Sequence, residues 1–205
     1  MEKNVRKNVI FLVILIVVIA FSAFMSYQYE RDFGNVKVSL VEIMNSEGEI
    51  VVAKMFIPKI ATVENPVPAI VNMHGYQNDK NVQDPFSIEL AKRGFVVMAP
   101  DSLGHGDSGG GLNVGRWFAD PTYVMGNEDA LSYLITLPFV QGDKIGVMGH
   151  SMGGMNAVKL PGLFPENVQA VVQQASSPGS PELPNLMMLQ ARYDEFAGFR
   201  ENQLR

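Results

Sequence analysis

The sequence of 205 residues contains no cysteine. This absence excludes disulfide bonds, zinc–thiolate sites, a cysteine nucleophile and a lipid-modified thiol. Positive charge is also scarce, because 16 Lys and Arg residues stand against 21 Asp and Glu residues and give a formal net charge of −5. The composition therefore offers no basic footprint for a nucleic-acid backbone, and we expect no nucleic-acid partner.

The first thirty residues contain a long apolar run. No charged residue occurs from Val9 to Met25, and a helix of this length, at about 1.5 Å per residue, roughly matches the hydrocarbon core of a bilayer. Tyr27 and Tyr29 follow, and tyrosine is a residue type typical of membrane interfaces. We predict a transmembrane signal anchor over residues 9–29.

Two other interpretations of this run stay open. A cleaved signal peptide usually has a shorter apolar region, and Ala20-Phe21-Ser22 is a poor cleavage site. A buried core helix would need a polar face, which this segment lacks.

The flanking charges predict the orientation of the anchor. Lys3, Arg6 and Lys7 precede the apolar run, whereas Arg31 is the single basic residue just after it. By the positive-inside rule, the N-terminal residues 1–8 are cytoplasmic and the part of the chain that follows the anchor is extracytoplasmic. Residues 30–35 then form a linker to a single domain over residues 36–205.

The pattern after the linker is typical of an α/β fold. Val36, Val38 and Leu40 alternate with polar residues, residues 50–57 form a second β-rich run, and residues 45–48 supply a turn between them. This opening predicts an antiparallel hairpin.

Short continuous apolar runs follow, of the kind expected from strands that are buried on both faces. These runs cover residues 69–73, 95–99, 145–148, 168–172 and 186–189. Helical patterns lie between them at residues 84–92, at residues 123–137 and from Ser151 onward. The alternation predicts a mostly parallel, doubly wound sheet with an antiparallel N-terminal hairpin.

A candidate nucleophile lies between one of these strands and a helix. Residues 149–153 read Gly-His-Ser-Met-Gly, which is the G-x-S-x-G pattern in the strand–turn–helix context of a nucleophile elbow. Gly149 and Gly153 remove side chains that would clash across the strained turn, and the Ser151 hydroxyl projects at a helix N-terminus, where developing negative charge is favoured. The bare pattern would match about one random chain in fifteen of this length. The predicted strand and helix around it carry the functional interpretation.

Three segments of the sequence resemble the α/β-hydrolase superfamily, and they occur in the order found in that family. Residues 69–76 (AIVNMHGY) resemble the third strand with its oxyanion loop, residues 99–108 (APDSLGHGDS) the loop after the fourth strand, and residues 149–154 (GHSMGG) the elbow. The last two are most similar to the serine esterase and lipase-like branch, with monoacylglycerol lipases, lysophospholipase-like esterases and serine aminopeptidase-like proteins. The fold alone selects no substrate.

The resemblance implies a role for each matching residue. Ser151 would be the nucleophile, and the backbone N–H groups of Tyr76 and Met152 would form the oxyanion hole. Asp194, after the predicted strand over residues 186–189, would orient the catalytic histidine, with Glu195 as the alternative acid. Supporting positions would be His74, Gly75, Gly149 and Gly153.

The histidines depart from the family pattern. An α/β-hydrolase orders its triad as serine, acid, histidine, yet His74, His105 and His150 all precede Ser151. His74 is expected to support the oxyanion loop, and His150 to point into packing. We expect the general base, with the last strand and helix of the fold, to lie beyond Arg205, so that this sequence is a C-terminally truncated piece.

The predicted function is that of a membrane-anchored serine hydrolase that cleaves small acyl esters or thioesters through an acyl-enzyme on Ser151. No metal site or cofactor motif is recognisable, and residues 109–111 (Gly-Gly-Gly) lack the lysine of a phosphate-binding loop. Two alternatives remain: a catalytically inactive domain that uses the hydrolase scaffold for binding, and an amidase or peptidase of the same fold.

Overall fold

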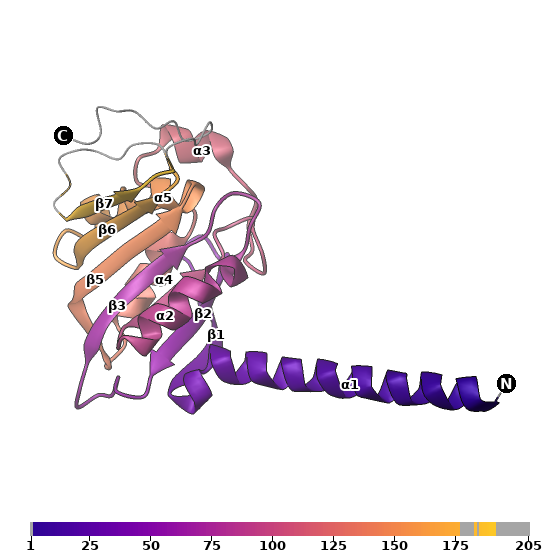
Figure 1. The fold of residues 1–205 in the computed structure, drawn as a ribbon. Helices are drawn as coiled ribbons and strands as arrows, with labels where there is room; N and C mark the ends of the chain where they lie inside the picture. The colour runs from indigo at the N-terminus through magenta and orange to yellow at the C-terminus, as the bar shows by residue number, and fades with distance from the viewer. Residues whose placement is uncertain (1, 177–182, 184, 192–205) are drawn as a thin grey trace.

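The computed structural model describes residues 2–176, 183 and 185–191, and within them a long helix leads into an α/β domain (Figure 1). The helices are α1 (Glu2–Glu30), η1 (Asp32–Gly34), η2 (Lys80–Gln83), α2 (Asp84–Lys92), α3 (Val114–Ala119), α4 (Asn127–Ile135), α5 (Met152–Ala157) and α6 (Leu160–Leu163). The strands are β1 (Val36–Met44), β2 (Ile50–Pro58), β3 (Val67–Met73), β4 (Val96–Pro100), β5 (Val140–His150), β6 (Val168–Gln174) and β7 (Leu186–Leu189).

The seven strands form one sheet in the order β1-β2-β4-β3-β5-β6-β7. β1 and β2 pair antiparallel, as do β2 and β4, and every later pair is parallel. The predicted fold class is therefore confirmed, including the antiparallel hairpin at its start. The hairpin turn is held by the Asn45 side chain, whose Oδ1 accepts hydrogen bonds from the N–H groups of Glu47 and Glu49 at 3.0 and 2.8 Å.

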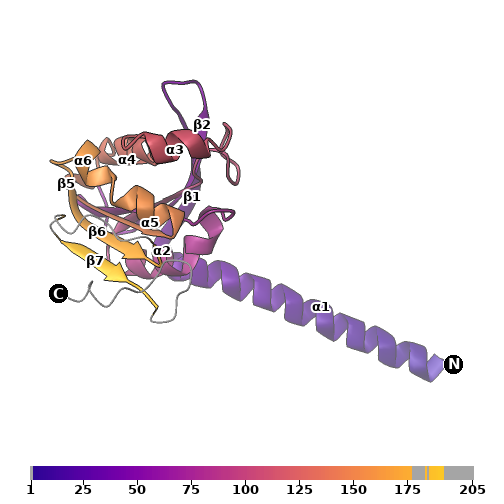
Figure 2. The ribbon, with the colours of Figure 1, turned by 90° about the horizontal axis from the view of Figure 1, so that it is seen from above.

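Helices cover both faces of the sheet (Figure 2). α4, α5 and α6 pack on one face, where the main core includes Val71, Val147, Leu131 and Leu160. α2 covers the other face beside β2 and β4, with Ile88 in a smaller core. This arrangement explains why the inner strands are apolar at nearly every position.

α2 spans the residues that the sequence predicts, and it ends before Gly94, whose φ of +94° suits glycine. α4 is shorter than predicted at both ends. The expected start at Tyr123 is wrong, because Met125 and Gly126 have φ values of +60° and +81° and hold the chain out of helical geometry until Asn127.

α1 extends the predicted anchor to a continuous helix, of which residues 4–30 are long and apolar enough to cross a membrane. None of its most apolar window is buried against the rest of the structure, so the described residues do not use it as a core helix. Within the predicted linker, Glu30 still belongs to α1 and the short helix η1 follows.

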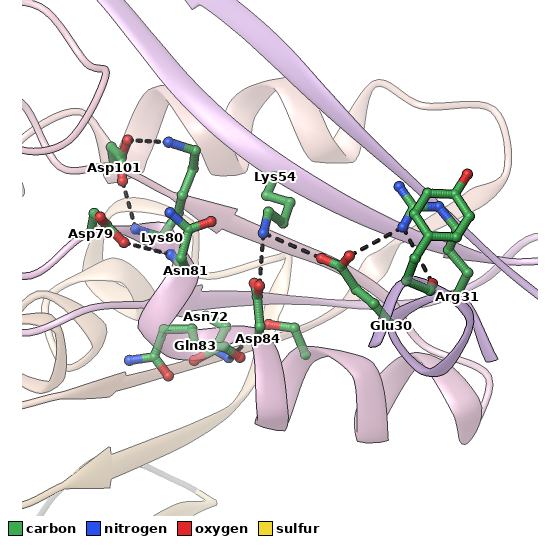
Figure 3. Close-up of polar contacts among 12 residues, drawn as sticks. Glu30, Arg31, Lys54, Asn72, Asp79, Lys80, Asn81, Gln83, Asp84 and Asp101 are labelled. Atoms are coloured by element: carbon green, nitrogen blue, oxygen red, sulfur yellow. Dashed lines mark hydrogen bonds and ion pairs between the residues drawn. The ribbon is translucent and has the colours of Figure 1, made fainter. Parts of the chain in front are cut away.

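The last turn of α1 docks on the domain (Figure 3). The Lys54 Nζ on β2 lies 2.7 Å from an oxygen of Asp84 and 3.5 Å from an oxygen of Glu30. The Tyr29 hydroxyl donates to Glu89 on α2 at 3.4 Å. These contacts fix the base of α1 against β2 and α2.

Candidate active site

Ser151 occupies a strained turn between β5 and α5. Its φ of +51° and ψ of −113° lie outside the backbone regions that residues with a side chain favour. The turn is held by three hydrogen bonds: the Ser151 N–H donates to the carbonyl oxygen of Gln174 at 2.9 Å, and the Ser151 carbonyl oxygen accepts from the N–H of Met155 at 3.1 Å and the hydroxyl of Ser176 at 2.8 Å. The surrounding structure thus imposes the strain.

The elbow glycines are required by close backbone packing. A β-carbon on Gly149 would overlap the backbone of Gly153 and stand 2.7 Å from the amide nitrogen of Gly154. A β-carbon on Gly153 would overlap the carbonyl group of Met73 at the end of β3. The two glycines are therefore required because the backbone of α5 closely contacts both β5 and β3.

The loop after β3 lies against the elbow. A β-carbon on Gly75 would be 2.8 Å from Nδ1 of His150 and 3.4 Å from its carbonyl oxygen. The Asn78 N–H donates to the Gly75 carbonyl oxygen at 3.2 Å, a turn that does not use the N–H of Tyr76. Met152 is the first residue of α5, and its N–H has no acceptor within the helix.

His74 is a fully buried structural residue. Its Nε2 accepts a hydrogen bond from the N–H of Ser102 at 3.0 Å, and its Nδ1 lies 2.7 Å from the carbonyl oxygen of Gly75. An acceptor at Nε2 and a donor at Nδ1 describe the neutral ring. Desolvation by burial lowers the pKa of His74, which agrees with a neutral ring. Both ring nitrogens are engaged, so His74 is not placed to take a proton from Ser151.

The other two histidines are also not placed to act as a general base for Ser151. The His105 ring is buried and packs 5.2 Å from the His74 ring and 5.8 Å from the Tyr76 ring, between centroids. His150 is exposed, so the expectation that it points into packing is wrong, because its ring lies over Gly75 at the surface. Among the described residues, no hydrogen bond joins a histidine to the Ser151 hydroxyl.

Asp194 and Glu195, the predicted acid and its alternative, lie outside the described residues. β7, the strand expected before them, is present at Leu186–Leu189 and pairs parallel with β6. In the part of the chain that the structure covers, no group of three or more His, Asp or Glu side chains is arranged to hold a metal ion.

The sequence did not predict the wall beside the elbow, which α3 provides. Trp117 of α3 is buried and donates from Nε1 to Oδ1 of Asn156 on α5 at 2.6 Å. The Lys159 Nζ donates to the carbonyl oxygens of Trp117, Asp120 and Tyr123 at 2.9, 3.3 and 3.2 Å. α3 is thereby fixed to the helices that follow Ser151. The one signal in the sequence that could have indicated this element is the single tryptophan that follows a glycine-rich stretch.

A large apolar groove of about 570 Å³ lies on the other side of the sheet from α5. It is lined by residues of β3, β5, β6 and α2, among them Ile70, Met148, Val172 and Phe86, and Ser151 is not part of it.

Comparison with known proteins finds relatives of similar sequence. An uncharacterised protein of Mycobacterium tuberculosis is 31% identical over 105 residues, which are 51% of this chain and 28% of that protein. A protein of Mycobacterium phage D29 that is named as a non-heme haloperoxidase is 31% identical over 137 residues, 67% of this chain and 46% of that protein. The chain spans less than half the length of these two relatives.

Acetyl xylan esterase 1 from Thermoanaerobacterium sp. superposes with a TM-score of 0.57 and 23% identity over 69% of this chain and 49% of its own. This similarity shows a shared fold. Residues 68–205 match the family model described as alpha/beta hydrolase fold. Since the match covers more than half of the sequence and includes the strained serine turn, the chain belongs to the α/β-hydrolase fold family.

Proposed function

We propose that this protein is a membrane-anchored serine hydrolase that cleaves carboxylic esters or thioesters through an acyl-enzyme on Ser151. The observation that carries the proposal is the strained backbone of Ser151, held by Gln174, Met155 and Ser176 and closed in by glycines. Strain of this kind persists where the surrounding structure over-determines it, and it clusters at functional sites. The esterase of the same fold supports the reaction class.

The reaction would proceed by acyl transfer. The Ser151 oxygen attacks the carbonyl carbon of the ester, and the N–H groups of Tyr76 and Met152 donate to the resulting oxyanion. Collapse of the tetrahedral intermediate expels the alcohol or thiol and leaves an acyl group on Ser151, which water then removes. Asp194 would orient the histidine that takes and returns the proton, and we expect that histidine beyond Arg205.

The first experiment is active-site labelling of the full-length protein with a fluorophosphonate. We expect covalent labelling of the wild type and none of Ser151→Ala. A matched control is Ser46→Ala, in the exposed turn between β1 and β2, which should label as the wild type does. Equal labelling of the wild type and Ser151→Ala would refute the proposal. A folded wild-type protein that never labels would favour the inactive binding scaffold instead.

The predicted membrane topology has its own test, which the lack of cysteine makes simple. Asn4→Cys and Ser46→Cys place single thiols at exposed positions before the apolar run and in the domain. In intact cells, an impermeant maleimide should modify the thiol at position 46 and spare the one at position 4 until the membrane is opened. The reverse pattern would refute the orientation, and loss of α1 from the mature protein would indicate a cleaved signal peptide.

A further inference from the structure

Lys80 is an almost fully buried lysine at the start of η2. Its side chain is 4% exposed, and its Nζ lies 2.7 Å from Oδ2 of Asp101 and 2.6 Å from Oδ2 of Asp107. Asp101 has no exposed surface, whereas the Asp107 side chain is 69% exposed. Asp101 is therefore the more important partner of Lys80, because a pair with an exposed carboxylate contributes little.

Asp101 is also bound by backbone groups. Its Oδ1 accepts the N–H of Lys80 at 2.6 Å, and its Oδ2 accepts the N–H of Asp107 at 2.8 Å. A β-carbon on Gly106 would overlap the Asp101 carboxylate, so the loop after β4 wraps closely around this group. Figure 3 shows the Lys80 and Asp101 side chains meeting between η2 and the end of β4.

The position of Lys80 in the chain gives this ion pair its significance. The loop that begins at His74 and carries Tyr76 ends at Lys80. Its first residue is joined to the loop after β4 by the hydrogen bond between His74 and Ser102, and its last by the pair between Lys80 and Asp101. The segment that presents the Tyr76 N–H is thus fastened at both ends to one neighbouring loop.

Stability alone does not explain a buried ion pair at this place. Removing two charges from water is costly, and apolar residues of similar size often give equal or greater stability. Burial by itself would lower the pKa of Lys80, but hydrogen bonds to Asp101 and Asp107 outweigh it and raise that pKa. The Lys80 ammonium therefore stays charged at neutral pH and supplies a directional contact that an apolar side chain would not.

We propose that Lys80 is a positioning residue that, through Asp101, holds the backbone N–H of Tyr76 in place to receive the oxyanion. This inference rests on the proposed function of Ser151 as nucleophile. A donor that is held loosely stabilises the transition state less, while ground-state binding of the ester changes little.

The test compares steady-state hydrolysis of p-nitrophenyl butyrate by full-length variants. Lys80→Met should lower kcat by about 10- to 100-fold, the range expected when an oxyanion donor is displaced, with KM within about twofold. Lys80→Arg should recover part of the loss. The matched control Lys92→Met removes a lysine that pairs with Glu89 at 3.0 Å on the surface of α2, and should leave both constants unchanged.

Lys80→Met leaves the buried Asp101 carboxylate without its cation and can prevent folding. The double variant Lys80→Met/Asp101→Asn removes both charges, and we expect it to fold and to show the same selective loss of kcat. Unchanged kcat in this folded variant would overturn the proposal. A loss of kcat that only follows a loss of global stability, with no recovery of kcat in Lys80→Arg, would also overturn it.

Amide hydrogen exchange separates this proposal from the proposed function. Exchange over residues 74–80 should accelerate in Lys80→Met and in Lys80→Met/Asp101→Asn and stay at the wild-type rate in Lys92→Met, whether or not the protein hydrolyses esters. Unchanged exchange in that segment would refute the tether. A wild type that fails to label at Ser151 would refute the proposed function, while the exchange data still decide whether Lys80 orders the loop.

Discussion

A β-carbon on Gly153 would stand 2.6 Å from the carbonyl oxygen of His74. The helix after the candidate nucleophile therefore lies in close contact with the loop that carries the candidate oxyanion donor. The contact is between backbone groups, so no side-chain movement can relieve it. The relative position of Ser151 and Tyr76 therefore depends on the absence of a side chain at position 153.

We predict that Gly153→Ala destabilises the protein by about 3 kcal/mol, because an added β-carbon overlaps main-chain carbonyl groups in a closely packed region. Gly162→Ala is the matched control, since nothing lies within 4 Å of a β-carbon at that exposed position in α6. It should be neutral or stabilising by about 0.5–1 kcal/mol. Urea unfolding of the two variants measures the difference, and equal midpoints would contradict the packing argument.

The strain at Ser151 predicts an unusual order of stability for two variants at this position. Glycine adopts a φ of +51° without penalty, whereas alanine does not. Ser151→Gly should therefore be more stable than Ser151→Ala by about 1 kcal/mol, the lower end of the cost of such strain. Thermal unfolding at one pH is sufficient. If Ser151→Ala is the more stable of the two, the serine turn is not strained in solution.

Glu128, in the first turn of α4, is a carboxylate in an unfavourable environment. Its Oε2 is buried without a hydrogen-bond partner among the described residues. Desolvation by burial raises the pKa of Glu128 to about 7. The folded protein then holds a proton that the unfolded chain releases near pH 4.5. The stability that this proton provides is complete below about pH 4.5 and is lost as the pH rises through 7.

Glu128→Gln should remove this pH dependence, because the amide stays neutral. We expect the variant to match the wild type near pH 4.5 and to be more stable by about 2 kcal/mol at pH 8, given about 1.4 kcal/mol per pKa unit and some solvent access. Denaturation midpoints across this range provide the measurement. A stability difference that does not change with pH would argue against a raised pKa at this position.

The docking of α1 depends on Lys54, which pairs with both Glu30 and Asp84. Lys54→Met should free the last turn of α1 and make the bond after Arg31 more accessible to trypsin. A loss of about 1.4 kcal/mol in the free energy of local opening corresponds to about tenfold faster cleavage. Lys59→Met, at an exposed position after β2, is the control. Cleavage at the same rate in both variants would mean that Lys54 does not hold α1.

Patterns of local sequence predicted much of the fold. The apolar runs around Val71 and Val147 indicated inner strands because parallel strands are covered on both faces, and this feature repeats along the chain. The elbow was recognisable because Gly149, Ser151 and Gly153 lie within five consecutive residues, and their spacing follows from one turn of backbone.

Contacts between distant segments were not recognisable in the same way. Lys80 and Asp101 are separated by a helix and a strand, and a lysine in a polar sequence gives no sign of burial. α3 is short and follows a glycine-rich loop, so its helical pattern is too brief to stand out. The start of α4 was misplaced because the apolar residues around Val124 satisfy a helical pattern. Their side chains are buried in the core, but their backbone forms a loop.

Trp117 is the one tryptophan in the sequence, and its indole is buried beside the elbow with its N–H on Asn156. The tryptophan fluorescence of the protein therefore originates from a single indole next to α5. Its emission wavelength and its quenching by iodide report on water entry beside Ser151, so that the proposed acylation or a movement of α3 can be followed by emission without any added dye.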